Sequence, residues 1–278
     1  MSFKIVGDSC CDFTEQDLAK DYIERVPLTI RVGDDEFVDD SSLKQGILLE
    51  KIRNYPESAK TSCPSPMEYL TKFDNADQVY AVTLSSKLSG SYNSAKIAGS
   101  LYTEEDNKKQ FHVFDSKGAA GAQYLIVLKI EELIKKGFGF RSVVESVEEY
   151  IKNMHLFFVL DDLETLRKNG RLSGIKALLA AKLHIKPILC AFDGEIKQIG
   201  QVMGIKNALA TIVEKIAALQ ENLHDRIAVI SHCSCYERAV NLIDLLKERK
   251  IHFKEILIRD TMGISSTYAN EGGIIISY

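Results

Sequence analysis

The stretch that decides the fold is VYAVTLSSKLSGSY, residues 79–92. Residues 79–84 read as a buried strand, and the hydroxyl-rich loop after them opens a helix near Ser91. A strand that ends in small hydroxyl residues and glycine before a helix leaves backbone N–H groups and hydroxyls pointing outward. Such a loop can hold an anion, either a carboxylate or a phosphate. We therefore place the candidate binding site here, with Ser89 and Gly90 at its centre.

Three other polar segments are expected to meet this loop. Asp8-Ser9 and Asp115-Ser116 each follow an apolar strand, and Thr61-Ser62 precedes a proline-rich turn. In an open parallel sheet, loops gather at the carboxyl ends of the strands, where ligands usually bind. The three segments should therefore lie close to residues 85–91.

The order of elements predicts a two-domain α/β protein. Strands near residues 3–7, 79–84 and 111–114 alternate with helices, which predicts a parallel sheet, and Ser65-Pro66 with Glu68 has the pattern of a capped helix start. In the second half Asp193-Gly194 joins two apolar runs, a strong hairpin signal that predicts an antiparallel or mixed sheet. We expect an N-terminal α/β domain over residues 1–153 and a C-terminal α/β domain over residues 154–278, with a ligand crevice between them. The second-half elements are expected at residues 156–160, 183–192, 195–199, 206–220, 226–231, 235–249 and 251–259.

Composition excludes several classes of function. The 278 residues carry a net charge of −4 and no aromatic-and-basic stripe, so nucleic-acid binding is not expected. No run reaches the roughly 20 apolar residues that cross a bilayer, and the N-terminus lacks a signal-peptide pattern, so we expect a cytoplasmic protein. The six cysteines are irregularly spaced and lack paired CxxC motifs, which argues against a disulfide framework and against a metal site. No cofactor is expected.

Six segments together resemble the DegV family. They lie in order over nearly the whole chain, and they are Asp8-Ser9 with Asp12, Thr61-Ser62-Cys63-Pro64-Ser65-Pro66, Leu88-Ser89-Gly90-Ser91-Tyr92, Asp115-Ser116, Leu163-x-x-Leu166-Arg167-Lys168-x-Gly170-Arg171-Leu172-Ser173 and Lys186-Pro187-Ile188-Leu189. The resemblance implies a bacterial protein that binds a long-chain fatty acid and does not catalyse a reaction. Some members of the family present the bound carboxylate to a separate fatty acid kinase.

The resemblance also implies roles for individual residues. The predicted ligands of the fatty acid head group are Thr61, Ser62, Ser89, Gly90, Ser91 and Tyr268. Residues expected to support the pocket or its loops are Asp8, Ser9, Cys63, Ser85, Asp115, Ser116 and Arg171. Taken without the resemblance, Ser89 is better interpreted as a helix cap than as a ligand, and Arg171 is interpreted as an anchor of loop carbonyls or of a carboxylate across the domain junction. His184 reads as a hydrogen-bonded core residue.

Two departures from the family pattern leave alternatives open. Tyr268 stands about where the family places a histidine, and a phenol carries no positive charge at neutral pH. Met203 and Ile205 stand where basic residues are typical, which puts kinase docking in question. An acyl hydrolase with Ser89 as nucleophile and His232 as base is one rival function, although the G-x-S-x-G elbow is absent. A binder of a phosphorylated metabolite is the other.

Overall fold

A computed structural model describes residues 2–172, 184–219 and 221–278. The strands are β1 (Phe3–Asp8), β2 (Ile23–Val26), β3 (Thr29–Val32), β4 (Asp35–Val38), β5 (Lys60–Ser62), β6 (Gln78–Thr83), β7 (Gln110–Asp115), β8 (Leu156–Val159), β9 (Ile185–Phe192), β10 (Glu195–Met203), β11 (Ile227–His232), β12 (Glu255–Asp260) and β13 (Ile274–Ser277). The helices are the 3₁₀ helix η1 (Ser9–Cys11) and α1 (Glu15–Leu18), α2 (Gln45–Asn54), α3 (Pro66–Leu70), α4 (Ser91–Glu105), α5 (Gly121–Lys135), α6 (Phe140–Lys152), α7 (Glu164–Lys168), α8 (Ile205–Ala218), α9 (Tyr236–Glu248) and α10 (Gly263–Ala269).

The first half is built on a four-stranded sheet in the order β2-β1-β6-β7, in which every pair is parallel. Alternate residues of the strands face opposite layers of helix. Ile5, Tyr80 and Phe114 pack with α5 and α6 on one face. Val79 and Ala81 pack with α3 and α4 on the other. The predicted parallel α/β sheet is confirmed, as is the capping box at the start of α3.

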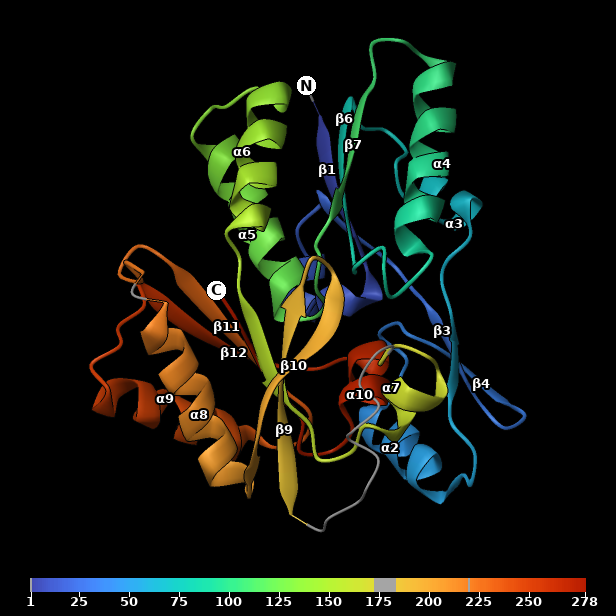
Figure 1. The fold of residues 1–278 in the computed structure, drawn as a ribbon. Helices are drawn as coiled ribbons and strands as arrows, with labels where there is room; N and C mark the ends of the chain where they lie inside the picture. Colours follow the sequence, from blue (N-terminus) through green and yellow to red (C-terminus); the bar gives the residue numbers. More distant parts are fainter. Residues whose placement is uncertain (1, 173–183, 220) are drawn as a thin grey trace.

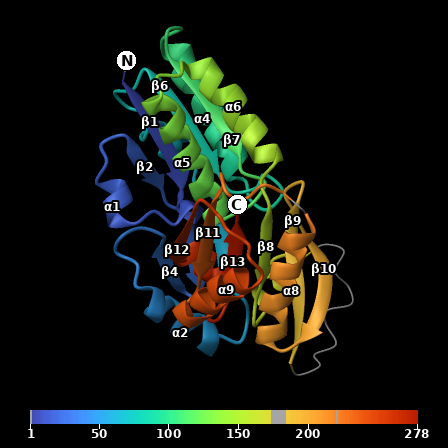
Figure 2. The same ribbon diagram turned by 90° about the vertical axis from the view of Figure 1, so that its left-hand side faces the viewer.

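The second half is built on a six-stranded sheet in the order β10-β9-β8-β13-β11-β12. Only β11 and β12 run parallel, so the predicted mixed sheet is confirmed. The β9–β10 hairpin turns at Asp193-Gly194, whose φ angles of 47° and 81° fit the predicted tight turn. Helices α8 and α9 bury their apolar faces against this sheet. Both views show the parallel sheet in the upper part of the molecule and the mixed sheet in the lower part (Figure 1, Figure 2).

Some expectations differ from the structure. The last parallel strand begins at Glu255 rather than residue 251, and the hairpin strand begins at Ile185. His184, expected in the core, is exposed at the start of that strand with a φ of 83°, because the chain turns there before it enters the sheet. Leu183 and Ser173 lie outside the described residues.

A three-stranded antiparallel sheet, β4-β3-β5, joins the two halves. Helix α10 comes from the end of the chain, yet it packs on α2 and β3 from the first half (Figure 1). Helix α5 contacts strands of both large sheets. The chain therefore passes from the parallel sheet to the mixed sheet between residues 115 and 156. Helices α5 and α10 nevertheless pack on elements of both halves, so a domain boundary at residue 153 stays a prediction. Among the described residues, no helix has the length and apolar character needed to cross a bilayer.

Candidate functional site

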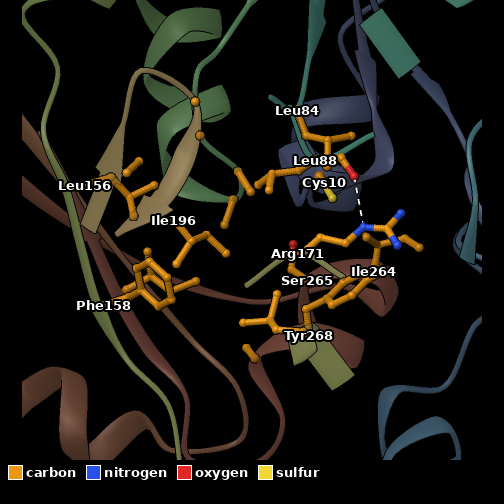
Figure 3. A pocket seen from close by; sticks show the side chains of 18 of the residues that line it. Cys10, Leu84, Leu88, Leu156, Phe158, Arg171, Ile196, Ile264, Ser265 and Tyr268 are labelled. Atoms are coloured by element: carbon orange, nitrogen blue, oxygen red, sulfur yellow. Dashed lines mark hydrogen bonds between the residues drawn. The ribbon is translucent and has the colours of Figure 1, made fainter. Parts of the chain in front are cut away.

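A cavity lies between the two large sheets. Its empty volume is about 770 Å³, including the part open to solvent. The walls are almost entirely apolar and come from both halves of the chain. Their larger apolar side chains are Leu84, Leu88, Leu156, Phe158, Leu160, Leu166, Ile196, Ile264 and Ile275. Figure 3 shows Arg171 and Tyr268 on one side of this cavity and Leu156 and Phe158 on the opposite side.

The polar side of the cavity contains two predicted residues, Tyr268 and Arg171. Tyr268 Oη lies 2.7 Å from Thr61 Oγ1, so helix α10 and strand β5 meet through their hydroxyls. Burial raises the pKa of Tyr268 above its ordinary value, which keeps the phenol protonated and able to donate. Arg171 Nε donates to the carbonyl of Leu88 at 3.1 Å, and its Nη1 donates to the carbonyl of Asn169. Arg171 therefore anchors the loop that ends in Ser89.

The hydroxyl loop forms a compact turn. The N–H groups of Leu88 and Ser89 both donate to the carbonyl of Ser85, at 2.9 and 3.1 Å. Ser89 Oγ accepts from the N–H of Ser91 at 3.2 Å, but the N-cap residue of α4 is Gly90, so the interpretation of Ser89 as the helix cap is wrong. Gly90 lies against the segment that contains Cys63, because a Cβ at Gly90 would lie 2.9 Å from Cys63 Sγ. The loop around Ser89 and the segment that follows Thr61 are therefore neighbours.

Other predicted residues hold backbone around the site. Asp8 is fully buried and accepts from the N–H groups of Cys10 and Leu84, at 3.1 and 2.8 Å, and from Gln123 Nε2 at 2.8 Å. Burial raises its pKa to about 6, although these donors oppose the shift. Ser9 Oγ accepts from the N–H of Leu28 at 3.1 Å. Asp8 and Ser9 are scaffold residues beneath the loops.

Four further predicted residues lie outside the cavity wall. Asp115 accepts from the N–H groups of Ser86 and Lys117, and Ser116 Oγ donates to the carbonyl of Gly118 at 3.1 Å. Ser62 and Cys63 are exposed. None of these four predicted residues lines the cavity, and of the predicted head-group residues only Tyr268 does.

Sequence reasoning did not find how helix α10 is held. The carboxylate of Asp39 is buried and accepts from the N–H groups of Gly263 and Ile264, at 2.8 and 2.9 Å. Asp12 accepts from the N–H of Met262 at 2.7 Å, and burial raises its pKa to about 8. These carboxyls fix the start of the helix that carries Tyr268. Asp39 stands in a turn with no distinguishing motif, so only the fold reveals its role.

The geometry gives little support to the hydrolase. Ser89 Oγ contacts Ser91, whereas His232 lies in the mixed sheet with Nδ1 at 3.3 Å from Asp260 Oδ1. No hydrogen bond joins Ser89 to His232 among the described residues, so the pairing of nucleophile and base is missing. No cluster of three or more His, Cys, Asp or Glu side chains in the described part of the chain could hold a metal ion.

Comparison with known proteins gives the family. The sequence model of the DegV family, described as an uncharacterised protein family, matches residues 2–278. A DegV domain-containing protein of Streptococcus gordonii is 36% identical, with 100% of this chain and 99% of the relative aligned. A DegV family protein of Ruminococcus gnavus, solved with vaccenic acid, is 48% identical with a TM-score of 0.95 over 100% of both chains. The Fatty Acid Kinase (Fak) B3 protein of Streptococcus pneumoniae, solved with linoleic acid, is 32% identical with a TM-score of 0.92 over 100% of this chain and 99% of that one. The chain therefore belongs to the DegV family.

Proposed function

We propose that the protein binds a long-chain fatty acid, with its acyl chain in the cavity and its carboxylate at the polar end. The observation that carries the proposal is the cavity itself, which is apolar along its length and bordered at one end by Tyr268 and Arg171. Thr61 and Ser89 lie on segments that meet at this end. The related proteins solved with vaccenic and linoleic acid support the same class of ligand.

The two parts of the ligand have different roles in this proposal. Burying about 14 methylenes at about 0.8 kcal/mol each gives a gross stabilisation of about 11 kcal/mol. Each hydrogen bond to the carboxylate adds a net of about 1.5–3 kcal/mol. The acyl chain therefore supplies most of the affinity, and the hydroxyls fix where the carboxylate lies.

The Thr61–Tyr268 pair suits a carboxylate. Each hydroxyl has one proton, and at 2.7 Å one of them donates to the other. The second proton is then free to point at a carboxylate oxygen, which makes a charge-assisted bond. The Arg171 charge acts at this site as well, because it opposes the effect of burial on the pKa of Tyr268. Tyr268 can thus take the place of a histidine without carrying a charge itself.

The proposal includes binding without turnover, and the surroundings of Ser89 support it. In the part of the chain that the structure describes, Ser89 Oγ hydrogen-bonds to Ser91 and to no base, which suits it to hold an anion rather than to attack an ester. We extend the proposal to a fatty acid kinase that acts on the presented carboxylate, since the pneumococcal relative is named for such a system. Met203, one of the positions where the family has basic residues, is 69% exposed, so such a partner would meet no positive charge there.

The ligand can be identified directly. The purified protein is extracted with organic solvent, and the extract is analysed by mass spectrometry against a mock purification. We expect one fatty acid per chain. A stoichiometric phosphate ester would overturn the proposal, as would an empty extract together with no binding of added fatty acids.

A further inference from the structure

The tip of the β9–β10 hairpin covers one side of the cavity. Ala191, Gly194, Glu195 and Ile196 all line the cavity, and they surround the hairpin turn. Strand β10 is an edge strand of the mixed sheet, so this hairpin is held to the rest of its own sheet through β9 alone. Opening the tip would expose the cavity without breaking the central strands.

The tip is docked on the other half of the molecule. Ser85 Oγ donates to the carbonyl of Gly194 at 2.7 Å, and both residues are buried. A Cβ at Gly194 would lie 2.6 Å from Ser85 Oγ, 3.2 Å from Cγ of Lys87 and 3.3 Å from Cδ of Lys117. The turn therefore needs glycine for two reasons, its φ of 81° and this close contact.

An ion pair reinforces the same contact. Lys117 Nζ lies 3.3 Å from Asp193 Oδ1 in the turn and 3.5 Å from Asp115 Oδ2 in its own loop. Burial alone would lower the pKa of Lys117, but the two carboxylates outweigh it and raise the pKa above its ordinary value. The pair is largely exposed, so salt should weaken it.

Ser85 belongs to the loop that carries the head-group residues. Its hydroxyl also accepts from the N–H of Lys87 at 3.2 Å, while its carbonyl accepts from the N–H groups of Leu88 and Ser89. One residue thus connects the hairpin over the acyl chain to the loop beside the carboxylate.

We propose that the β9–β10 turn is a latched lid over the acyl chain, with the Ser85–Gly194 hydrogen bond and the Lys117–Asp193 ion pair as the latch. The inference rests on the proposed fatty acid site and concerns how ligand enters and leaves it. We place the latch contacts in both the free and the ligand-bound protein, so the latch adds equally to the barrier for entry and for release.

The test compares variants of the full chain by stopped-flow exchange of a fluorescent fatty acid. Ser85→Ala should raise the association and dissociation rate constants together by about tenfold, which corresponds to about 1.4 kcal/mol. The dissociation constant should change by less than about twofold. Unchanged rates would overturn the latch, as would a slower release or a weaker affinity with unchanged association, because the last result is what loss of a ligand contact produces.

A second variant isolates the turn from the loop. Asp193→Asn removes the charge but keeps an Asn-Gly turn, which also favours a tight hairpin. It should raise both rate constants by about two- to threefold at low salt and by less at high salt. Lys197→Met is the matched control, because Lys197 pairs with Glu195 inside the hairpin. An effect of this control as large as that of Asp193→Asn would refute the ion-pair part of the latch.

Hydrogen exchange separates failure of the latch from failure of the proposed function. In ligand-free protein, Ser85→Ala should accelerate amide exchange in residues 188–198 and leave α9 unchanged. Unaltered exchange in the hairpin would refute the latch even if fatty acids bind. A wild-type protein that binds no fatty acid would refute the function, and the exchange result would still decide whether the hairpin is latched.

Discussion

Replacing Tyr268 with phenylalanine removes one hydroxyl from the polar end of the cavity and leaves the ring. Tyr268 is half-buried, and its Oη lies 2.7 Å from Thr61 Oγ1. Its ring packs among apolar side chains that also border the cavity, including Leu88. Because the variant keeps this packing, its effect on binding reports the hydroxyl rather than a change of shape.

The size of the effect follows from the bond that is lost. A charge-assisted hydrogen bond is worth about 1.5–3 kcal/mol net, and each 1.4 kcal/mol is a factor of ten in affinity. Tyr268→Phe should therefore weaken fatty acid binding by about 10- to 150-fold. A fatty alcohol of the same length offers a neutral oxygen, for which the loss should be about 0.5–1.5 kcal/mol, or less than about 13-fold.

Calorimetry or competition with a fluorescent fatty acid measures both ligands. Tyr236→Phe is the matched control, since Tyr236 is 58% exposed at the start of α9 and does not line the cavity. Equal affinity of wild type and Tyr268→Phe for the fatty acid would refute the placement of the carboxylate at Tyr268. An equal loss for acid and alcohol would show that the hydroxyl contacts the ligand but not its charge.

Three further outcomes are expected. Ser89→Ala and Thr61→Val should each weaken fatty acid binding by about 10-fold or more with unchanged circular dichroism, and unchanged affinity in both would return these residues to structural roles. The Asp12 carboxyl has a pKa of about 8 against an ordinary 3.8, so it binds its proton more tightly in the folded state than in the unfolded state, and its stabilising contribution is lost as pH rises toward and through 8. The free energy of unfolding measured in urea should fall from pH 6 to 9 for the wild type, and it should fall less for Asp12→Asn. Ile196→Trp should exclude ligands of 18 carbons while shorter acids still bind, whereas Ile97→Trp, on the exposed side of α4, should change neither; equal binding of long acids by both would place the acyl chain elsewhere.

The parts of the fold that could be predicted from the sequence are those with local signals. Continuous apolar runs marked the central strands, because strands of a parallel sheet are buried on both faces. Asp193-Gly194 marked the hairpin, because few residue pairs adopt two positive φ angles. Helix α10 and strand β13 were not predicted, because each is short and the glycines between them interrupt the regular spacing of apolar residues that indicates a helix or a strand. The place of β13 in the sheet depends on pairing with β8 and β11, which no local pattern records.

The candidate site likewise has one part that local sequence signals predict and another part that they do not. Strand–loop–helix order was enough to bring the loops after β1 and β6 together, because that order fixes which edge of a sheet the loops occupy. Thr61 comes from β5 of the separate antiparallel sheet, which that order did not predict. The cavity wall could not be predicted, because it is assembled from residues as far apart as Leu84 and Ile275. Long-range pairing decides which apolar side chains face inward and leave space between them.

Ser85 takes part both in a loop that the sequence predicts and in a long-range contact that only the fold reveals. The sequence places it in a polar loop, where a hydroxyl needs no partner other than water. The fold buries it and gives it five hydrogen bonds, through its hydroxyl with Gly194 and Lys87 and through its backbone with Leu88, Ser89 and Gly118. A buried donor left without an acceptor costs about 1–3 kcal/mol, so the bond from Ser85 Oγ to Gly194 favours the arrangement in which the hairpin is docked. The Ser85 hydroxyl thus closes the cavity over the acyl chain, while the backbone carbonyl of the same residue shapes the loop beside the carboxylate.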